Sequence, residues 1–227
     1  GAVTLSNLLV TDNAAGGFGG AVNNNASGAI SIQTSTISRN TTQGSSFGGG
    51  INNNWTGSIS IADSVVSENT AGGWGGGVNN NWTGTIGITG SELSDNTATG
   101  WGGGINNNDD GAVTIALATI TGNSAENGGG INNNDGGTVT VTSSSISANT
   151  ATGTLGGGGI LNNSLGTVTI AATTIGENDS LAGNGGGIHN KFLMQRLRVL
   201  LPAASLTTSA DFGIDPDAKE AIAFAAL

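Results

Sequence analysis

The chain of 227 residues contains no cysteine and no tyrosine, and it has only two prolines and one histidine. Without cysteines the redox compartment is left undetermined, and secretion without disulfides is compatible with the sequence. Two prolines and no Gly-X-Y period exclude collagen, although the chain has 42 glycines. No run is long and apolar enough to span a bilayer, so we expect no membrane insertion.

Positive charge is also scarce. Residues 1–190 hold eleven acidic residues and one basic residue, Arg39, whereas residues 191–227 hold four of each sign. Such an acidic surface predicts that the chain binds neither nucleic acid nor anionic membranes. The chain starts at Gly1 within a repeat, so we expect any signal peptide to lie outside this sequence.

A motif of glycines, one Val or Ile, and then asparagines occurs seven times at intervals of 26 to 29 residues. We call the Val or Ile of each motif the anchor residue. The anchor residues are Val22, Ile51, Val78, Ile105, Ile131, Ile160 and Ile188. Low charge and abundant glycine are typical of disorder, but regularly placed Ile and Val with a period of about 28 residues predict a solenoid.

Each repeat predicts three short strands separated by turns. In the repeat that begins at Gly48, we expect strands at 49–53, 58–61 and 64–67, with the third ending at Asn69. The connections are too short for a crossover helix, so each strand pairs with its equivalents in the neighbouring coils, about 4.8 Å away. The sequence predicts an all-β solenoid of three parallel sheets and about seven coils.

Stacking gathers the apolar positions into columns, and Ile61, Val66, Ile88 and Ile115 are predicted to be buried. Asparagines recur in the same way, two residues after the anchor and at the end of the third strand. Alternation turns the first column inward and turns His189, one residue after its anchor, outward. Asparagine tolerates left-handed turns, and stacked amides form hydrogen-bonded ladders. The two columns are Asn24, Asn53, Asn80, Asn107, Asn133, Asn162 and Asn190, and Asn13, Asn40, Asn69, Asn96, Asn123, Asn149 and Asn178.

Residues 1–190 resemble the right-handed parallel β-helix repeats of bacterial surface and secreted proteins, in a superfamily that also contains pectate lyases. The resemblance implies a right-handed three-sheet β-helix located outside the cell or on the bacterial cell surface. The expected function is a non-enzymatic structural or adhesive module without cofactors, whose partner is a polysaccharide or a cell-surface glycan. Fold alone does not fix activity.

The composition changes after Asn190. Residues 191–202 have helical apolar spacing that ends at Pro202, and a second helix is predicted from Asp215, which suits an N-cap position. We therefore expect residues 191–227 to form a helical tail that caps the solenoid.

The end of the chain resembles the carboxyl-terminal end of anhydro-N-acetylmuramic acid kinases. The shared features are GGGxxN at Gly185–Asn190, LMxxL at Leu193–Leu197, LP at Leu201–Pro202 and GIxxDAKEAIAFA at Gly213–Ala225. The resemblance implies ATP and Mg²⁺ as cofactors, a cytoplasmic location, and nucleotide contacts from Gly185, Gly186 and Gly187. It also implies a catalytic lobe upstream, but residues 1–184 have the solenoid pattern instead. The alternative to a β-helix module is therefore a fragment or chimera of such a kinase without a complete active site.

Few residues suit catalysis, and no catalytic or metal-binding residue is predicted. Arg39 is the only cation before Lys191, and it shares a register with Asp12 and Glu68, which favours a surface ion pair. Asp109 and Asp135 share one register in successive coils, about 5 Å apart if stacked at the strand spacing. That separation is compatible with solvated turns, with a cation site or with a carbohydrate hydrolase.

Aromatic side chains share two registers. Phe18, Phe47, Trp74 and Trp101 lie four residues before an anchor, and Trp55 and Trp82 lie four residues after one. Rings at the coil spacing can stack on each other, and exposed rings can bind flat sugar faces. The candidate glycan-binding surface comprises Phe47, Trp55, Trp74, Trp82, Trp101, Asp109 and Asp135.

Overall fold

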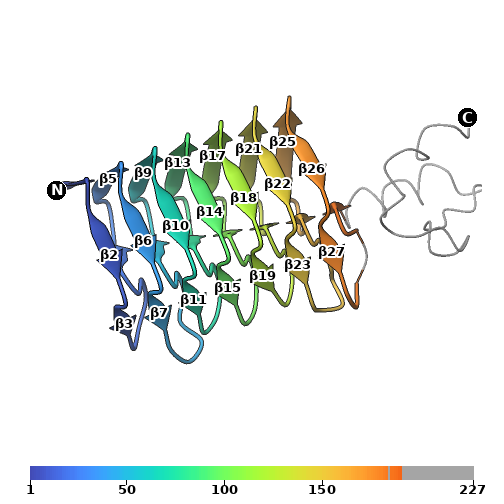
Figure 1. Ribbon diagram of the computed structural model, residues 1–227, viewed down its shortest axis with the longest axis horizontal. Helices are drawn as coiled ribbons and strands as arrows, with labels where there is room; N and C mark the ends of the chain where they lie inside the picture. Colours follow the sequence, from blue (N-terminus) through green and yellow to red (C-terminus); the bar gives the residue numbers. More distant parts are fainter. Residues whose placement is uncertain (184, 191–227) are drawn as a thin grey trace, which may run out of the picture.

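The computed structural model describes residues 1–183 and 185–190. This part of the chain is a parallel β-solenoid of about seven coils, and its 28 strands form four sheets of seven strands each. Successive coils lie side by side along the long axis of the molecule (Figure 1). The described residues contain no helix.

Two sheets carry the alternating aliphatic pattern. Sheet A consists of β1 (Ala2–Ser6), β5 (Ala29–Gln33), β9 (Ser58–Ala62), β13 (Thr85–Thr89), β17 (Ala112–Ala116), β21 (Thr138–Thr142) and β25 (Thr167–Ala171). Sheet B consists of β2 (Leu9–Thr11), β6 (Thr36–Ser38), β10 (Val65–Ser67), β14 (Glu92–Ser94), β18 (Thr119–Thr121), β22 (Ser145–Ser147) and β26 (Thr174–Gly176).

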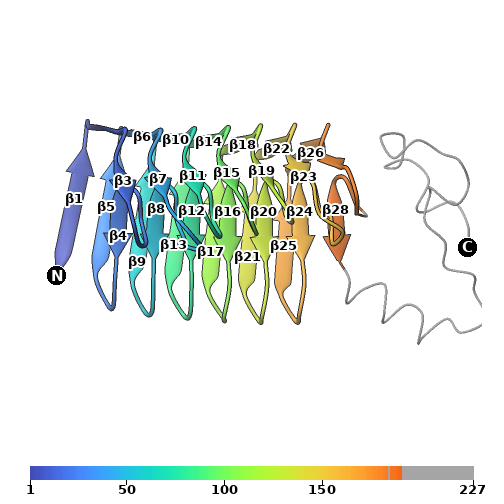
Figure 2. The ribbon, with the colours of Figure 1, turned by 90° about the horizontal axis from the view of Figure 1, so that it is seen from below.

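The other two sheets lie on either side of the glycine-rich segment. Sheet C consists of the two-residue strands β3 (Ala14–Ala15), β7 (Thr41–Thr42), β11 (Thr70–Ala71), β15 (Thr97–Ala98), β19 (Ser124–Ala125), β23 (Thr150–Ala151) and β27 (Asp179–Ser180). Sheet D begins at the anchor residues and consists of β4 (Val22–Asn24), β8 (Ile51–Asn53), β12 (Val78–Asn80), β16 (Ile105–Asn107), β20 (Ile131–Asn133), β24 (Ile160–Asn162) and β28 (Ile188–Asn190). Figure 2 shows strands of sheets A and D from below.

The predicted parallel solenoid is confirmed, and the three predicted strands of each repeat correspond to sheets D, A and B. Sheet C is an additional sheet that the sequence analysis missed. Its strands have only two residues, which is too few for an alternating pattern to be visible in the sequence. Alanines of this sheet, such as Ala71 and Ala98, are buried in a small cluster of their own. The predicted helices of residues 191–227, and with them the boundaries of the tail, lie outside the described residues.

The aliphatic columns form one continuous core. Ile61, Val66, Ile88 and Ile115, predicted to be buried, are at most 1% exposed. In the first coil the same columns are more exposed, and Val3 is 52% exposed, because that coil is covered on one side only in the described part of the chain.

Both predicted asparagine columns form hydrogen-bonded ladders. In sheet D, Asn53 Nδ2 donates to Asn80 Oδ1 over 2.8 Å, and Asn80 Nδ2 donates to Asn107 Oδ1 over 2.8 Å. At the end of sheet B, Asn69 Nδ2 donates to Asn96 Oδ1 over 2.9 Å, and the Asn69 backbone N–H donates to the same oxygen over 3.0 Å. The asparagines therefore satisfy buried polar groups between coils.

The position directly after the anchor is buried, not exposed as alternation predicts. Asn52, Asn79 and Asn106 are at most 2% exposed and form a third ladder. The glycine-rich segment packs against this outer row, since a Cβ atom on Gly48 would lie 2.8 Å from the Cβ of Asn52. In the inner coils the position that alternation turns outward is therefore covered, and the side chain of His189, which was expected to point outward, lies outside the described part of the chain.

Candidate ligand-binding edge

The first aromatic row precedes sheet D. Phe47 stacks on Trp74 with ring centroids 4.5 Å apart, and Trp74 stacks on Trp101 at 5.9 Å. Phe18 extends the row at 5.2 Å from Phe47 and is 46% exposed, whereas the other three rings are partly buried. Every inner ring thus has its faces turned to its neighbours, so this row packs the turns of successive coils.

The second aromatic row follows sheet D and consists of Trp55 and Trp82. Their rings are stacked and nearly parallel, with an interplanar angle of 6° and a centroid distance of 5.0 Å, and they are 50% and 48% exposed. The two rows flank opposite ends of the sheet D strands, and the aromatic contacts run within each row. The single surface that the sequence analysis proposed is therefore two separate rows.

Trp55 and Trp82 have unusual backbone conformations. Their φ angles are +61° and +59°, in the left-handed region that bulky residues rarely adopt. Asp109 and Asp135 occupy the same turn position with φ of +51° and +46°, which a short polar side chain tolerates better. Ala26 has a φ of +72° at the same turn position, so the left-handed conformation belongs to the turn of the coil and does not single out the two tryptophans.

Trp82 is linked to the next coil through the side chain of Asn81. With the Asn81 amide oriented to satisfy both of its neighbours, Asn81 Oδ1 accepts from Trp82 Nε1 over 3.1 Å and Nδ2 donates to Asp109 Oδ2 over 3.1 Å. Asn108 Nδ2 also donates to Asp109 Oδ2, over 2.8 Å. Sequence reasoning missed this network, although the asparagine column one residue before each of these turn positions was a signal that could have revealed it.

Asp109 is the carboxyl group on this edge with a shifted pKa. Partial burial raises the pKa above its usual value of 3.8, and the charges of Asp135 and Asp110 raise it further, while the hydrogen bond from Asn108 acts in the opposite direction. Asp135 has its own asparagine partner, because Asn134 Nδ2 donates to Asp135 Oδ2 over 2.6 Å.

Replacing Asp109 with asparagine is expected to stabilise the fold at pH 7. A raised folded-state pKa means that ionisation of Asp109 favours the unfolded chain, so the destabilisation is present above the folded-state pKa and disappears as the pH falls below 3.8. Urea unfolding of Asp109→Asn and wild type at pH 7 and pH 3.5 measures this, and we expect the gain at pH 7 only. A loss of stability at pH 7 would contradict the assignment.

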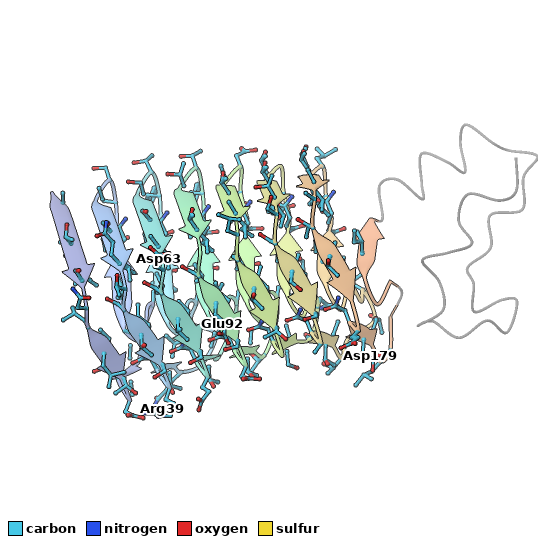
Figure 3. The ribbon with its side chains drawn as sticks, turned by 45° about the horizontal axis from the view of Figure 1, so that its top comes forward. Arg39, Asp63, Glu92 and Asp179 are labelled. Atoms are coloured by element: carbon cyan, nitrogen blue, oxygen red, sulfur yellow. The ribbon has the colours of Figure 1, made fainter. Side chains whose placement is uncertain are left out.

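The expected surface ion pair is present. Arg39 Nε donates to Asp12 Oδ1 over 2.9 Å and Nη2 donates to Asp12 Oδ2 over 3.0 Å, and both side chains are more than half exposed. The hydrogen bond from Arg39 lowers the pKa of Asp12. Figure 3 shows Arg39 at the lower edge near the amino-terminal end of the stack and Asp179 near the other end.

Within residues 1–183 and 185–190, no group of three or more His, Cys, Asp or Glu side chains is arranged to hold a metal ion. No helix in this part of the chain could cross a membrane.

The glycines that the kinase resemblance assigns to nucleotide binding take part in the coil ladder. Gly158 N–H donates to the Gly185 carbonyl over 3.1 Å, and Gly159 N–H donates to the Gly186 carbonyl over 2.7 Å. Gly185 has a φ of +69°, like the equivalent glycine of the preceding coil, Gly157, at +71°. This segment is therefore built as another turn of the solenoid.

Comparison with known proteins finds similarity at the carboxyl-terminal end. Residues 160–227 match the family described as anhydro-N-acetylmuramic acid kinase, and the part of this match that the structure describes, up to residue 190, forms strands β24 to β28. No solved structure matches the chain.

The similar curated proteins are named anhydro-N-acetylmuramic acid kinase. Those of Thiobacillus denitrificans (strain ATCC 25259 / T1), Synechococcus elongatus (strain ATCC 33912 / PCC 7942 / FACHB-805) and Pseudomonas savastanoi pv. phaseolicola (strain 1448A / Race 6) are 60%, 54% and 56% identical over 41 residues. These residues make up 18% of this chain and 11% of each relative. The chain thus spans about a tenth of the length of the relatives it matches.

Proposed function

We propose that the chain is a non-enzymatic, right-handed β-solenoid that serves as a rigid structural or adhesive module outside the cell or on the bacterial cell surface. The observation that carries this proposal is the continuity of the four sheets and the asparagine ladders, which use the recurring polar residues to join coil to coil. Such a ladder yields a stiff, extended surface, because each coil is fixed by its neighbours.

The second candidate is a fragment or chimera of anhydro-N-acetylmuramic acid kinase, which the match over residues 160–227 favours. Phosphoryl transfer depends on positioned phosphate-binding groups, metal ions and a base. Residues 1–159 lie outside the match and supply solenoid coils in place of a catalytic lobe. We therefore infer that kinase ancestry of the tail does not give this chain kinase activity.

The experiment that separates the two candidates incubates the purified intact chain with ATP, Mg²⁺ and anhydro-N-acetylmuramic acid. We expect no phosphorylated sugar by mass spectrometry. A complete kinase of this family, assayed in parallel, verifies that the assay detects product. Product formation by the intact chain, absent from a mock purification, would overturn the proposed function.

A carbohydrate hydrolase is the remaining alternative, resting on Asp109 and its neighbour Asp135. One carboxyl with a raised pKa beside a second carboxyl is the pattern of an acid–base pair, and the raised pKa of Asp109 is the observation in its favour. Release of reducing sugar from a polysaccharide, lost in Asp109→Asn, would favour the hydrolase over a non-enzymatic module.

A further inference from the structure

The stack of tryptophans ends at a small residue. The turn position four residues after the anchor holds Ala26 in the first coil, Trp55 in the second and Trp82 in the third. Trp82 covers one face of Trp55, with 5.0 Å between the ring centroids. On the other side of Trp55, the equivalent position carries only the methyl group of Ala26, which is itself exposed. A flat ring can therefore extend the stack where a third aromatic side chain would stand.

Polar groups surround the exposed ring of Trp55. Trp55 is half exposed, and the exposed Asn25 and Ser27 in the adjoining turn place polar groups beside its apolar face. An apolar platform with a few polar groups around it is the usual composition of a small-ligand site.

The negative charge of the chain favours neutral polysaccharides over acidic ones as ligands. Asp109, Asp110 and Asp135 follow the tryptophans in the next two coils, and Arg39 is the only cation in residues 1–190. These carboxylates lie beyond Trp82, but the chain as a whole has a formal net charge of −10, which repels polyanions, so pectin-like acidic polymers are disfavoured. A neutral polymer of sugar rings meets no such repulsion, and its hydroxyl groups can bond to the indole N–H and to the amides.

We propose that the face of Trp55 directed toward Ala26 binds a pyranose ring of a neutral polysaccharide. The axial C–H groups of such a ring lie against the indole face, and Trp82 supports Trp55 from behind. The inference gives the proposed adhesive module its ligand class and rests on that function. It replaces the broader aromatic surface with one subsite, because stacking occupies the faces of the inner rings in the other row.

The decisive variant is Ala26→Leu, which covers the face of Trp55 with a branched aliphatic side chain and offers no flat ring of its own. Ala26 has a φ of +72°, and leucine adopts comparable angles at Leu117 (+54°) and Leu165 (+63°), so the variant is expected to fold. Ser164→Leu is the matched control, since Ser164 occupies the same turn position in a distant coil with a φ of +43°. Trp55→Ala removes the platform itself.

Binding of cellohexaose is measured by calorimetry and by saturation-transfer NMR on the intact chain. Ala26→Leu and Trp55→Ala are expected to weaken binding at least tenfold, or about 1.4 kcal/mol, while Ser164→Leu binds like wild type. Thermal unfolding verifies that each variant is folded. Absence of binding to wild type, or unchanged binding by folded Ala26→Leu, would overturn the proposal.

Two other outcomes identify a different occupant and equally reject the proposal. Preference for polygalacturonate over cellohexaose would show that the ligand is acidic. Dimerisation of wild type in sedimentation equilibrium, lost in Ala26→Leu, would show that a second copy covers Trp55. Both results are compatible with the proposed non-enzymatic module. Phosphorylation of the sugar substrate in the kinase assay would instead reject the module, and it would not change the result of the binding measurements.

Discussion

Replacement of Asn96 by alanine is expected to destabilise the solenoid by about 3 kcal/mol or more, because each buried polar group that is left without a hydrogen-bond partner costs about 1–3 kcal/mol. Asn96 is fully buried. Its Oδ1 accepts from both the backbone N–H and Nδ2 of Asn69, and its Nδ2 donates to the Val66 carbonyl and to Asn123 Oδ1. The variant leaves the Asn69 backbone N–H without an acceptor in the middle of the stack.

Asn13→Ala is the matched control, since Asn13 occupies the same ladder position in the first coil but is exposed. Water can replace its bonds to Asn40 Oδ1 and the Thr11 carbonyl, so we expect a loss below about 1 kcal/mol. Urea unfolding monitored by circular dichroism measures both variants. Equal losses for Asn13→Ala and Asn96→Ala would show that the ladder does not hold the coils together.

Replacement of Gly103 by alanine is the second change expected to have a large effect. A Cβ atom at this position would clash with the Gly129 carbonyl oxygen of the next coil and would lie 2.5 Å from the Ser124 carbonyl oxygen. Both obstacles are backbone atoms within the ladder, so neither can rotate away. We expect a loss of at least about 3 kcal/mol, at the upper end of overpacking effects, seen as a lower urea midpoint or as insoluble protein.

Gly87→Ala tests whether the effect is specific to the close approach of coils. Gly87 lies in the middle of β13, and a Cβ atom there would meet nothing within 4 Å. Alanine reduces the entropy of the unfolded chain, so the variant is expected to be neutral or more stable by up to about 1 kcal/mol. Similar destabilisation by Gly87→Ala and Gly103→Ala would be incompatible with the glycine-dependent packing described above.

The aliphatic and asparagine columns could be predicted from the sequence because burial imposes a period on the residues themselves. Ile59 and Ile61 alternate with exposed serines, and the same pattern returns in each coil. Sheet C could not be predicted in this way, because a pair such as Thr70–Ala71 is too short to show a period and becomes a strand only through its pairing with Thr97–Ala98.

The candidate binding edge was predictable only in part. A shared register predicted that Trp55 and Trp82 stack, and their rings do so. The link from Trp82 through Asn81 to Asp109 depends on side-chain directions in left-handed turns, which alternation does not determine. Likewise, the burial of Asn52 depends on a glycine segment that packs over the outer face of its strand.

Amide hydrogen exchange on the intact chain tests the stacked-coil account most directly. Strong protection is expected in the strands of sheets A, B and D, recurring every 26 to 29 residues from β5 to β21, with rapid exchange in turns such as that of Trp55 and Thr56. The periodicity should extend through residues 1–159, outside the kinase match. Protection confined to residues 160–227, or absent from the repeats, would contradict the account.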